Sequence, residues 1–185
     1  MGFHTFDSAQ AEGLEDQTRY KYVSVDELLA LFGSGSSAVV ADLGSGTGFY
    51  TDEIAPYVGT LYAVDVQEEM HEYYRQKGLP GNVESVTAEV ADLPFEDDTL
   101  DGAYSTMTYH EFASEESLAE LARICRPGAR VGIADWSAMG TGERGPPLEE
   151  RFDAAEAATA FESAGFEVER AQDRRETFVL SVYLR

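Results

Sequence analysis

The stretch that decides the fold is residues 39–50, which read VVADLGSGTGFY. Apolar residues lead into an acid, Asp42, and glycines then stand at every second position, at Gly44, Gly46 and Gly48. A buried strand followed by a glycine-rich turn and a helix is the arrangement that holds nucleotide-like ligands in α/β proteins. We therefore expect a ligand-binding turn after the first strand of a parallel sheet.

The rest of the chain alternates between strand and helix patterns. We expect strands at residues 37–43, 60–65, 83–89, 100–106, 130–135, 166–171 and 177–184. We expect helices at residues 25–32, 49–55, 68–78, 114–125 and 153–165. Strands separated by such helices form right-handed βαβ units, whereas the last two are joined too closely for a crossover and should form an antiparallel hairpin. The sequence thus predicts one α/β domain over residues 24–185, preceded by an N-terminal extension over residues 1–23.

Composition narrows the class of protein. A length of 185 residues suits one packed domain, and we find no apolar run of the roughly 20 residues that span a bilayer. The formal net charge is −22, with 13 basic against 35 acidic residues, which is typical of a protein solvated at high salt, as in a halophile. Such a surface repels a phosphate backbone, so nucleic acid is not expected as a partner. We expect a cytoplasmic protein with no membrane contact.

The glycine loop departs from both common phosphate-binding patterns. Phe49 stands where a dinucleotide-binding loop has its third glycine, and no lysine follows as in a P-loop. Asp42 at the end of the strand opposes a phosphate and favours a cation. S-adenosylmethionine fits these demands, because it carries an ammonium, a sulfonium and no phosphate.

The segment DLGSGTG resembles the D/E-x-G-x-G-x-G signature of class I S-adenosylmethionine-dependent methyltransferases. Asp65 ends the second strand 23 positions after Asp42 (65 − 42), where an acid can accept both ribose hydroxyls. The segment AEVADLPFEDDTLD resembles the family's adenine-binding segment, which implies that Glu89 and Val90 face the adenine, while Asp92 falls three places too late. The resemblance implies these cofactor-binding residues: Asp42, Gly44, Ser45, Gly46, Gly48, Asp65, Val66, Glu89, Val90 and Ser105.

The resemblance covers almost the whole chain and implies the remaining features of the fold. It implies a Rossmann-like sheet of seven strands in the order 3-2-1-4-5-7-6, with strand 7 antiparallel and helices on both faces. The tail from residue 145 to residue 169 is similar to small archaeal and bacterial members related to the ubiquinone and menaquinone methyltransferases. The expected partner is a small-molecule methyl acceptor. No metal is expected, and a homodimer is compatible with the sequence.

Candidates for chemistry follow the fourth strand. His110 has a pKa suited to a general base, although it could instead pack beside the cofactor, and Tyr109 is the second candidate. Trp136 could wall the acceptor pocket or simply pack there, and Arg144 and Arg151 could meet an acidic acceptor or be ordinary surface arginines. Elsewhere, His71 is expected in solvent and Cys125 in the core, and the extension could be a lid over the cofactor.

Two other functions stay open at this point. A methyltransferase-like fold can serve as a non-catalytic cofactor- or partner-binding protein, and intact cofactor residues do not show transfer. A nicotinamide-dependent oxidoreductase is disfavoured by Phe49 in the loop. Within the enzyme reading, a protein acceptor is also open, because nothing in the sequence identifies the acceptor atom.

Overall fold

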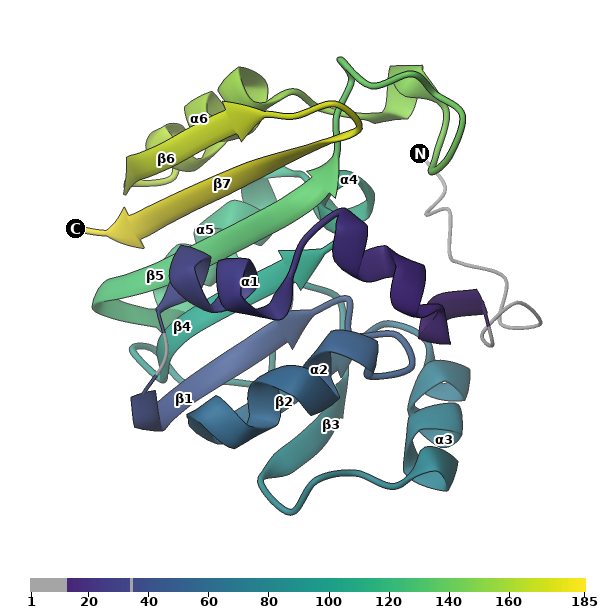
Figure 1. Cartoon of the computed structure of the whole chain (residues 1–185). Helices are drawn as coiled ribbons and strands as arrows, with labels where there is room; N and C mark the ends of the chain where they lie inside the picture. Colours follow the sequence, from purple (N-terminus) through teal and green to yellow (C-terminus); the bar gives the residue numbers. More distant parts are fainter. Residues whose placement is uncertain (1–12, 34) are drawn as a thin grey trace.

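A computed structural model describes residues 13–33 and 35–185 and shows a seven-stranded sheet in the order β3-β2-β1-β4-β5-β7-β6 (Figure 1). β7 runs antiparallel to both of its neighbours, and the other pairs are parallel. The expected strand order and direction are therefore confirmed. The strands are β1 (Gly35–Leu43), β2 (Val58–Asp65), β3 (Val83–Thr87), β4 (Leu100–Thr106), β5 (Cys125–Trp136), β6 (Phe166–Asp173) and β7 (Thr177–Leu184).

Helices cover both faces of the sheet (Figure 1). The α-helices are α1 (Val25–Phe32), α2 (Phe49–Ile54), α3 (Glu68–Lys77), α4 (Tyr109–Phe112), α5 (Glu115–Ile124) and α6 (Ala154–Ser163). Short 3-10 helices are η2 (Gln17–Lys21), η3 (Ala55–Tyr57) and η4 (Leu148–Glu150). α4 was not expected, because its four residues are too few to show a helical period.

Local signals in the sequence fix where the helices begin and end. Ser24 accepts a hydrogen bond from the backbone N–H of Glu27, and Asp153 and Glu156 form a full capping box. Pro56 ends α2, and the chain continues as η3. β5 differs from expectation, since it begins at Cys125 rather than at residue 130 and pairs with β4 across an irregularity in register.

The core divides into two buried clusters on opposite faces of the sheet. Neighbouring strand residues enter different clusters: Val40 packs with α1 and α2, whereas Ala41 packs with α5 and α6. Ala103 and Tyr104 in β4 alternate in the same way. This is the period of two that a sheet covered on both faces requires.

The described part of the N-terminal extension, residues 13–22, is called the strap below. It passes the carboxyl ends of β1 and β4, drawn as arrowheads (Figure 1). The Tyr50 hydroxyl donates to the carbonyls of Arg19 and Val23, and the Thr47 hydroxyl donates to Glu15 at 2.5 Å. The first twelve residues of the expected extension lie outside the described residues. No described helix is both long and apolar enough to cross a lipid bilayer.

Candidate functional site

A cavity of about 1030 Å³ opens beyond the carboxyl ends of the parallel strands. In open α/β sheets this is the edge at which ligands bind. Its walls come from the strap, the glycine loop (residues 44–48), the ends of β2 and β3, and the segments that follow β4 and β5. The cavity is thus built from segments spread over most of the chain.

The glycine loop needs its glycines for two different reasons. Gly44, Gly46 and Gly48 all have positive φ, which side chains rarely adopt. A Cβ on Gly44 would lie 2.3 Å from the Thr108 side chain, so this glycine also lets the loop approach the end of β4. A Cβ on Gly48 would lie 2.3 Å from the ring of Tyr74. Gly44 and Gly46 line the cavity, whereas Gly48 makes room for α3.

Asp65 lines the cavity at the end of β2, as expected. Its Oδ2 accepts from the backbone N–H of Gly46 at 2.8 Å, and its Oδ1 accepts from that of Gln67 at 2.9 Å. A carboxylate has about four acceptor sites, so each oxygen can still accept a hydroxyl from a ligand. The two amides fix the carboxylate in place beside the glycine loop.

Other expected cofactor residues also line the cavity. They are Ser45, Val66, Glu89 and Val90, whereas Asp92 is not among the lining residues. The hydroxyl of Ser45 is buried and has no hydrogen-bond partner among the described residues. A buried hydroxyl without a partner is costly, so a bound ligand with a polar group would satisfy it. The lining therefore fits a nucleoside with a ribose and a charged tail.

Asp42 lies in a different place from the one expected. Its side chain is buried on the α2 side of the sheet, where Oδ2 accepts from Thr51 at 2.6 Å and from Tyr104 at 3.1 Å, while Oδ1 has no described partner. The reason is the alternation of β1, which turns Asp42 to the same face as Val40. Burial raises the pKa of this carboxyl to about 7. Asp42 therefore supports the loop from beneath rather than facing the cavity.

Ser105 is also turned away from the cavity. Its buried hydroxyl donates to the carbonyl of Leu43 at 2.8 Å and so ties β4 to β1. Its neighbours Thr106, Met107 and Thr108 form the cavity wall instead. Met107 has a φ of 59°, which is rare outside glycine and marks the sharp turn out of β4.

His110 lines the cavity and is held by a buried carboxylate. Its Nδ1 lies 2.9 Å from Oδ2 of Asp135, which also accepts from the backbone N–H of His110 at 2.7 Å. Asp135 in turn accepts from the backbone N–H of Trp136. Burial lowers the pKa of His110, but the hydrogen bond and charge of Asp135 raise it, with a net rise above the ordinary value.

The hydrogen bond to Asp135 assigns the proton of neutral His110 to Nδ1 and leaves Nε2 as an acceptor. Nε2 lies 3.9 Å from a carboxylate oxygen of Glu111, another cavity residue. Burial raises the pKa of Glu111 to about 7. This pair of groups can accept a proton near neutral pH.

Tyr109, the second expected catalytic residue, points into the core. It is 1% exposed, and its ring contacts Phe112, Phe161 and Phe178. Burial raises the pKa of the Tyr109 hydroxyl well above the ordinary value for tyrosine. In the short helix α4 consecutive residues are about 100° apart, so the cavity receives His110 while the core receives Tyr109.

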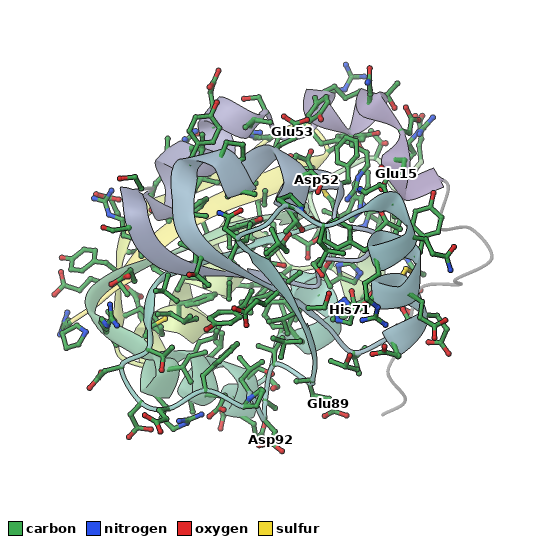
Figure 2. All side chains as sticks on the ribbon, turned by 90° about the horizontal axis from the view of Figure 1, so that it is seen from below. Glu15, Asp52, Glu53, His71, Glu89 and Asp92 are labelled. Carbon is green, nitrogen blue, oxygen red and sulfur yellow. The ribbon has the colours of Figure 1, made fainter. Side chains whose placement is uncertain are left out.

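His71 and Cys125, which lie outside the cavity, are both buried. His71 was expected in solvent, but its side chain is fully buried and its Nε2 lies 3.1 Å from the carbonyl oxygen of Val86. Figure 2 shows His71 on the helix α3. Cys125 is buried, as expected for a core residue, and burial raises the pKa of its thiol to about 12.

The far wall of the cavity is aromatic. The rings of Trp136 and Tyr22 meet edge to face at 4.7 Å between centroids, which joins the end of β5 to the strap. Gly145, with a φ of +81°, lies so close that a Cβ there would be 2.6 Å from the indole. Trp136 was one candidate for this wall, with ordinary packing as the alternative, whereas Tyr22 and Gly145 come from distant segments that no local pattern connects.

Comparison with known proteins places the chain in a family. The methyltransferase domain family matches residues 41–133, half of the chain. An S-adenosylmethionine-dependent methyltransferase structure from Aquifex aeolicus is 32% identical, with a TM-score of 0.88, and the match covers 98% of this chain and 100% of that one. The chain therefore belongs to the S-adenosylmethionine-dependent methyltransferases. S-adenosyl-L-methionine is the cofactor of this family, and the lining described above fits it.

Curated relatives agree over a shorter range. A methyltransferase-like protein of Schizosaccharomyces pombe is 33% identical over 98 residues, which are 52% of this chain and 38% of that protein. A demethylmenaquinone methyltransferase of Clavibacter sepedonicus is 34% identical over 101 residues, which are 53% of this chain and 41% of that protein. The match thus spans about two fifths of the length of these two relatives.

Proposed function

We propose that the protein transfers a methyl group from S-adenosyl-L-methionine to a small-molecule acceptor, with His110 as the base that removes the acceptor's proton. The observation that carries this proposal is the His110–Asp135 pair in the same cavity as Asp65 and the glycine loop. An imidazole oriented by a buried carboxylate is an arrangement suited to proton transfer.

Each part of the cavity then has a defined task. When bound, S-adenosyl-L-methionine supplies an electrophilic methyl group on a sulfonium. Asp65 binds the ribose, and the loop amides and Ser45 hold the polar tail. Glu89 and Val90 lie at the adenine end.

At the acceptor end, Nε2 of His110 takes the proton of the attacking group. Asp135 acts as a positioning residue, because it holds Nδ1–H and stabilises the imidazolium that forms. The strap lines the same cavity and limits the entry of water. Methyl transfer depends mainly on alignment, so a rigid wall and a single oriented base are sufficient.

Composition and kinship support the finer parts of the proposal. A net charge of −22 supports work at high salt, where the Debye length is about 3 Å at 1 M. Similarity to a demethylmenaquinone methyltransferase supports a small aromatic acceptor and kinship with the quinone-type enzymes.

Calorimetric titration with S-adenosylmethionine and S-adenosylhomocysteine in molar KCl tests the cofactor half of the proposal. We expect binding by the wild type and its loss in Asp65→Ala. The matched control is Asp92→Ala, which removes an exposed acid that does not line the cavity and should leave binding unchanged. Failure of the folded wild type to bind either molecule would overturn the proposal.

Turnover tests the acceptor half. An acceptor screen that detects S-adenosylhomocysteine release should find a small molecule that the wild type methylates and His110→Ala methylates far more slowly. Equal turnover by His110→Ala would reject His110 as the base while leaving methyl transfer itself in place.

A further inference from the structure

Most of the basic residues of this acidic chain lie close to a carboxylate, but a few do not. All 13 lysines and arginines lie within the described residues. Nine of them lie within 4.0 Å of a carboxylate. The four without such a partner in the described part of the chain are Arg19, Lys21, Arg144 and Arg151. With 35 acids available, cations left without one call for an explanation.

Arg151 has a structural explanation. It is 5% exposed, and its guanidinium donates to the carbonyls of Pro146 and Arg144 and approaches that of Ser137. It therefore fixes the loop that follows β5. The other three cations lie at the cavity or beside it.

Arg19 and Arg144 line the large cavity, and Arg144 and Lys21 line a second hollow of about 400 Å³. The two spaces share Tyr22 and Arg144 in their walls, so they lie next to each other. The strap and the loop after β5, which carry these residues, lie near each other at the carboxyl edge of the sheet (Figure 1).

The second hollow is basic, although the protein as a whole is strongly acidic. Its lining residues are Lys21, Tyr22, Glu143, Arg144, Arg174, Arg175, Glu176 and Thr177. Arg174 is engaged by Glu27 and by the carbonyl of Tyr22, and Arg175 lies 3.7 Å from Glu176. Lys21 and Arg144 have no carboxylate within 4.0 Å among the described residues, although the Lys21 ammonium lies 4.7 Å from the centroid of the Tyr22 ring. Hydrogen bonds lower the pKa of the nearby Asp16, and the charges of both cations lower it further.

We infer that the methyl acceptor is an organic anion, with an apolar body against Trp136 and Tyr22 and a carboxylate or phosphate group between Lys21 and Arg144. The inference rests on the proposed methyl transfer, since it takes the ligand of the cavity to be the acceptor. The aromatic wall connects the basic hollow to the His110 segment, because Tyr22 lines the hollow and contacts Trp136, and Trp136 directly follows Asp135, which holds His110. At high salt the repulsion from distant acids is screened. The two acids that line the hollow, Glu143 and Glu176, are outnumbered there by four basic side chains.

Binding of three matched probes tests this inference without turnover. The probes are benzoate, phenyl phosphate and uncharged benzamide, each titrated with S-adenosylhomocysteine present and absent. Trp136 is the single tryptophan of the chain and reports occupancy by its fluorescence, with equilibrium dialysis as an independent measurement. We expect at least one anion to bind about tenfold more tightly than benzamide, the factor for one charge-assisted contact.

Two double variants separate the site from net charge. Lys21→Gln with Arg144→Gln should reduce the preference for the anion to about twofold or less. Arg75→Gln with Arg185→Gln removes the same charge from exposed ion pairs outside both spaces and should retain the preference. Circular dichroism of each variant confirms that it is folded.

The outcomes distinguish this inference from the proposed function. Equal binding of benzamide and both anions, or a preference retained in the Lys21 and Arg144 variant, would overturn the anionic acceptor. A preference for benzoate or for phenyl phosphate would each support it and tell which anionic group is carried. If the wild type bound an anion in preference to benzamide but did not bind S-adenosylhomocysteine, the methyltransferase proposal would be rejected while the anion site would stand.

Discussion

The two halves of the cavity are built in different ways. The proposed cofactor half consists of the glycine loop and the ends of β2 and β3, and it presents backbone amides together with the carboxylates of Asp65 and Glu89. The acceptor half presents side chains that converge from four segments, represented by Tyr22, His110, Trp136 and Arg144. A backbone geometry such as the glycine loop can be recognised from one short stretch of sequence. Side chains that come together from several segments can be recognised only once the whole fold is known.

The largest effect on ligand binding should follow from one added methyl group in the cofactor half. In Gly44→Ala the new Cβ would meet Thr108 at 2.3 Å at a φ of +78°, so the loop must move. We expect S-adenosylhomocysteine binding to fall by at least about a hundredfold, the effect of about 3 kcal/mol of misfit. Calorimetry measures it.

The control for this prediction is Gly78→Ala. Its φ is +101°, but nothing lies within 4 Å of the new Cβ, so it adds backbone strain without a clash. It should cost about 1 kcal/mol of stability and leave cofactor binding intact. If Gly44→Ala binds S-adenosylhomocysteine as well as Gly78→Ala does, the glycine loop is not rigid and its backbone geometry does not determine binding.

The largest effect on stability, rather than on binding, is the pH dependence caused by Asp42 beneath the loop. Its pKa of about 7 in the folded protein, against an ordinary 3.8, means that the folded state holds a proton that the unfolded state releases. The contribution to stability is therefore present below about pH 4 and is lost as the pH rises through 7. The free energy of unfolding of the wild type should therefore fall by about 4 kcal/mol relative to that of Asp42→Asn as the pH rises from 4 to 8, because the variant has no carboxyl to ionise.

Denaturant unfolding at several pH values measures this difference, and Asp92→Asn is the matched control. Asp92 is exposed, so its variant should differ from wild type by a nearly constant amount. A pH-independent difference for Asp42→Asn would mean that the carboxyl stays ionised in the fold.

The contrast between the halves also explains what the sequence could and could not predict. The strand order followed from the resemblance, and the capping residues Ser24 and Asp153 are local signals that mark two helix starts. The position of Asp42 was available but missed, because strand alternation places it on the face of Val40. The place of Tyr109 was not available, since α4 is too short to give a periodic signal.

His71 shows the same limit in a longer helix. Met70 and Tyr74 form a buried i, i+4 pair on α3, and His71 lies beside that stripe at its edge. Whether an edge position is buried depends on the neighbouring strand, here β3 with the carbonyl of Val86. The contact of Tyr22 with Trp136 is likewise tertiary, because the two residues are more than a hundred positions apart.

The acceptor half should respond through chemistry rather than through binding. His110→Gln should lower turnover about a hundredfold, the usual contribution of a general base, without changing S-adenosylhomocysteine affinity. Asp135→Asn should lower the pKa of His110, because it removes the charge and hydrogen bond that raise it. The acidic limb of the pH–rate profile then moves to lower pH, and NMR titration of His110 measures the same shift. An unchanged His110 titration in folded Asp135→Asn would reject the positioning role.

The smallest effect should come from the strap, which connects the two halves. Glu15 accepts from Thr47 in the glycine loop and pairs with Lys77, which also pairs with Asp52 at 2.9 Å. Figure 2 shows Glu15, Asp52 and Glu53, which come from the strap and α2. Exposed ion pairs contribute about 0.2–1 kcal/mol, so Glu15→Gln should speed amide hydrogen exchange in residues 13–22 by only a few-fold.

The control for the strap is Glu68→Gln, which breaks an exposed pair with Arg75 on α3 that does not touch the strap. S-adenosylhomocysteine should slow exchange in residues 13–22 of the wild type and of this control, because a filled cavity gives the strap more to pack against. In Glu15→Gln that protection should be weaker, since the link to Thr47 in the loop is reduced. Equal protection in all three proteins would show that the strap is held by its remaining hydrogen bonds and aromatic contacts. The aromatic contacts join Tyr20 to Phe49 and Tyr22 to Trp136, and either pair could then anchor it without help from the loop.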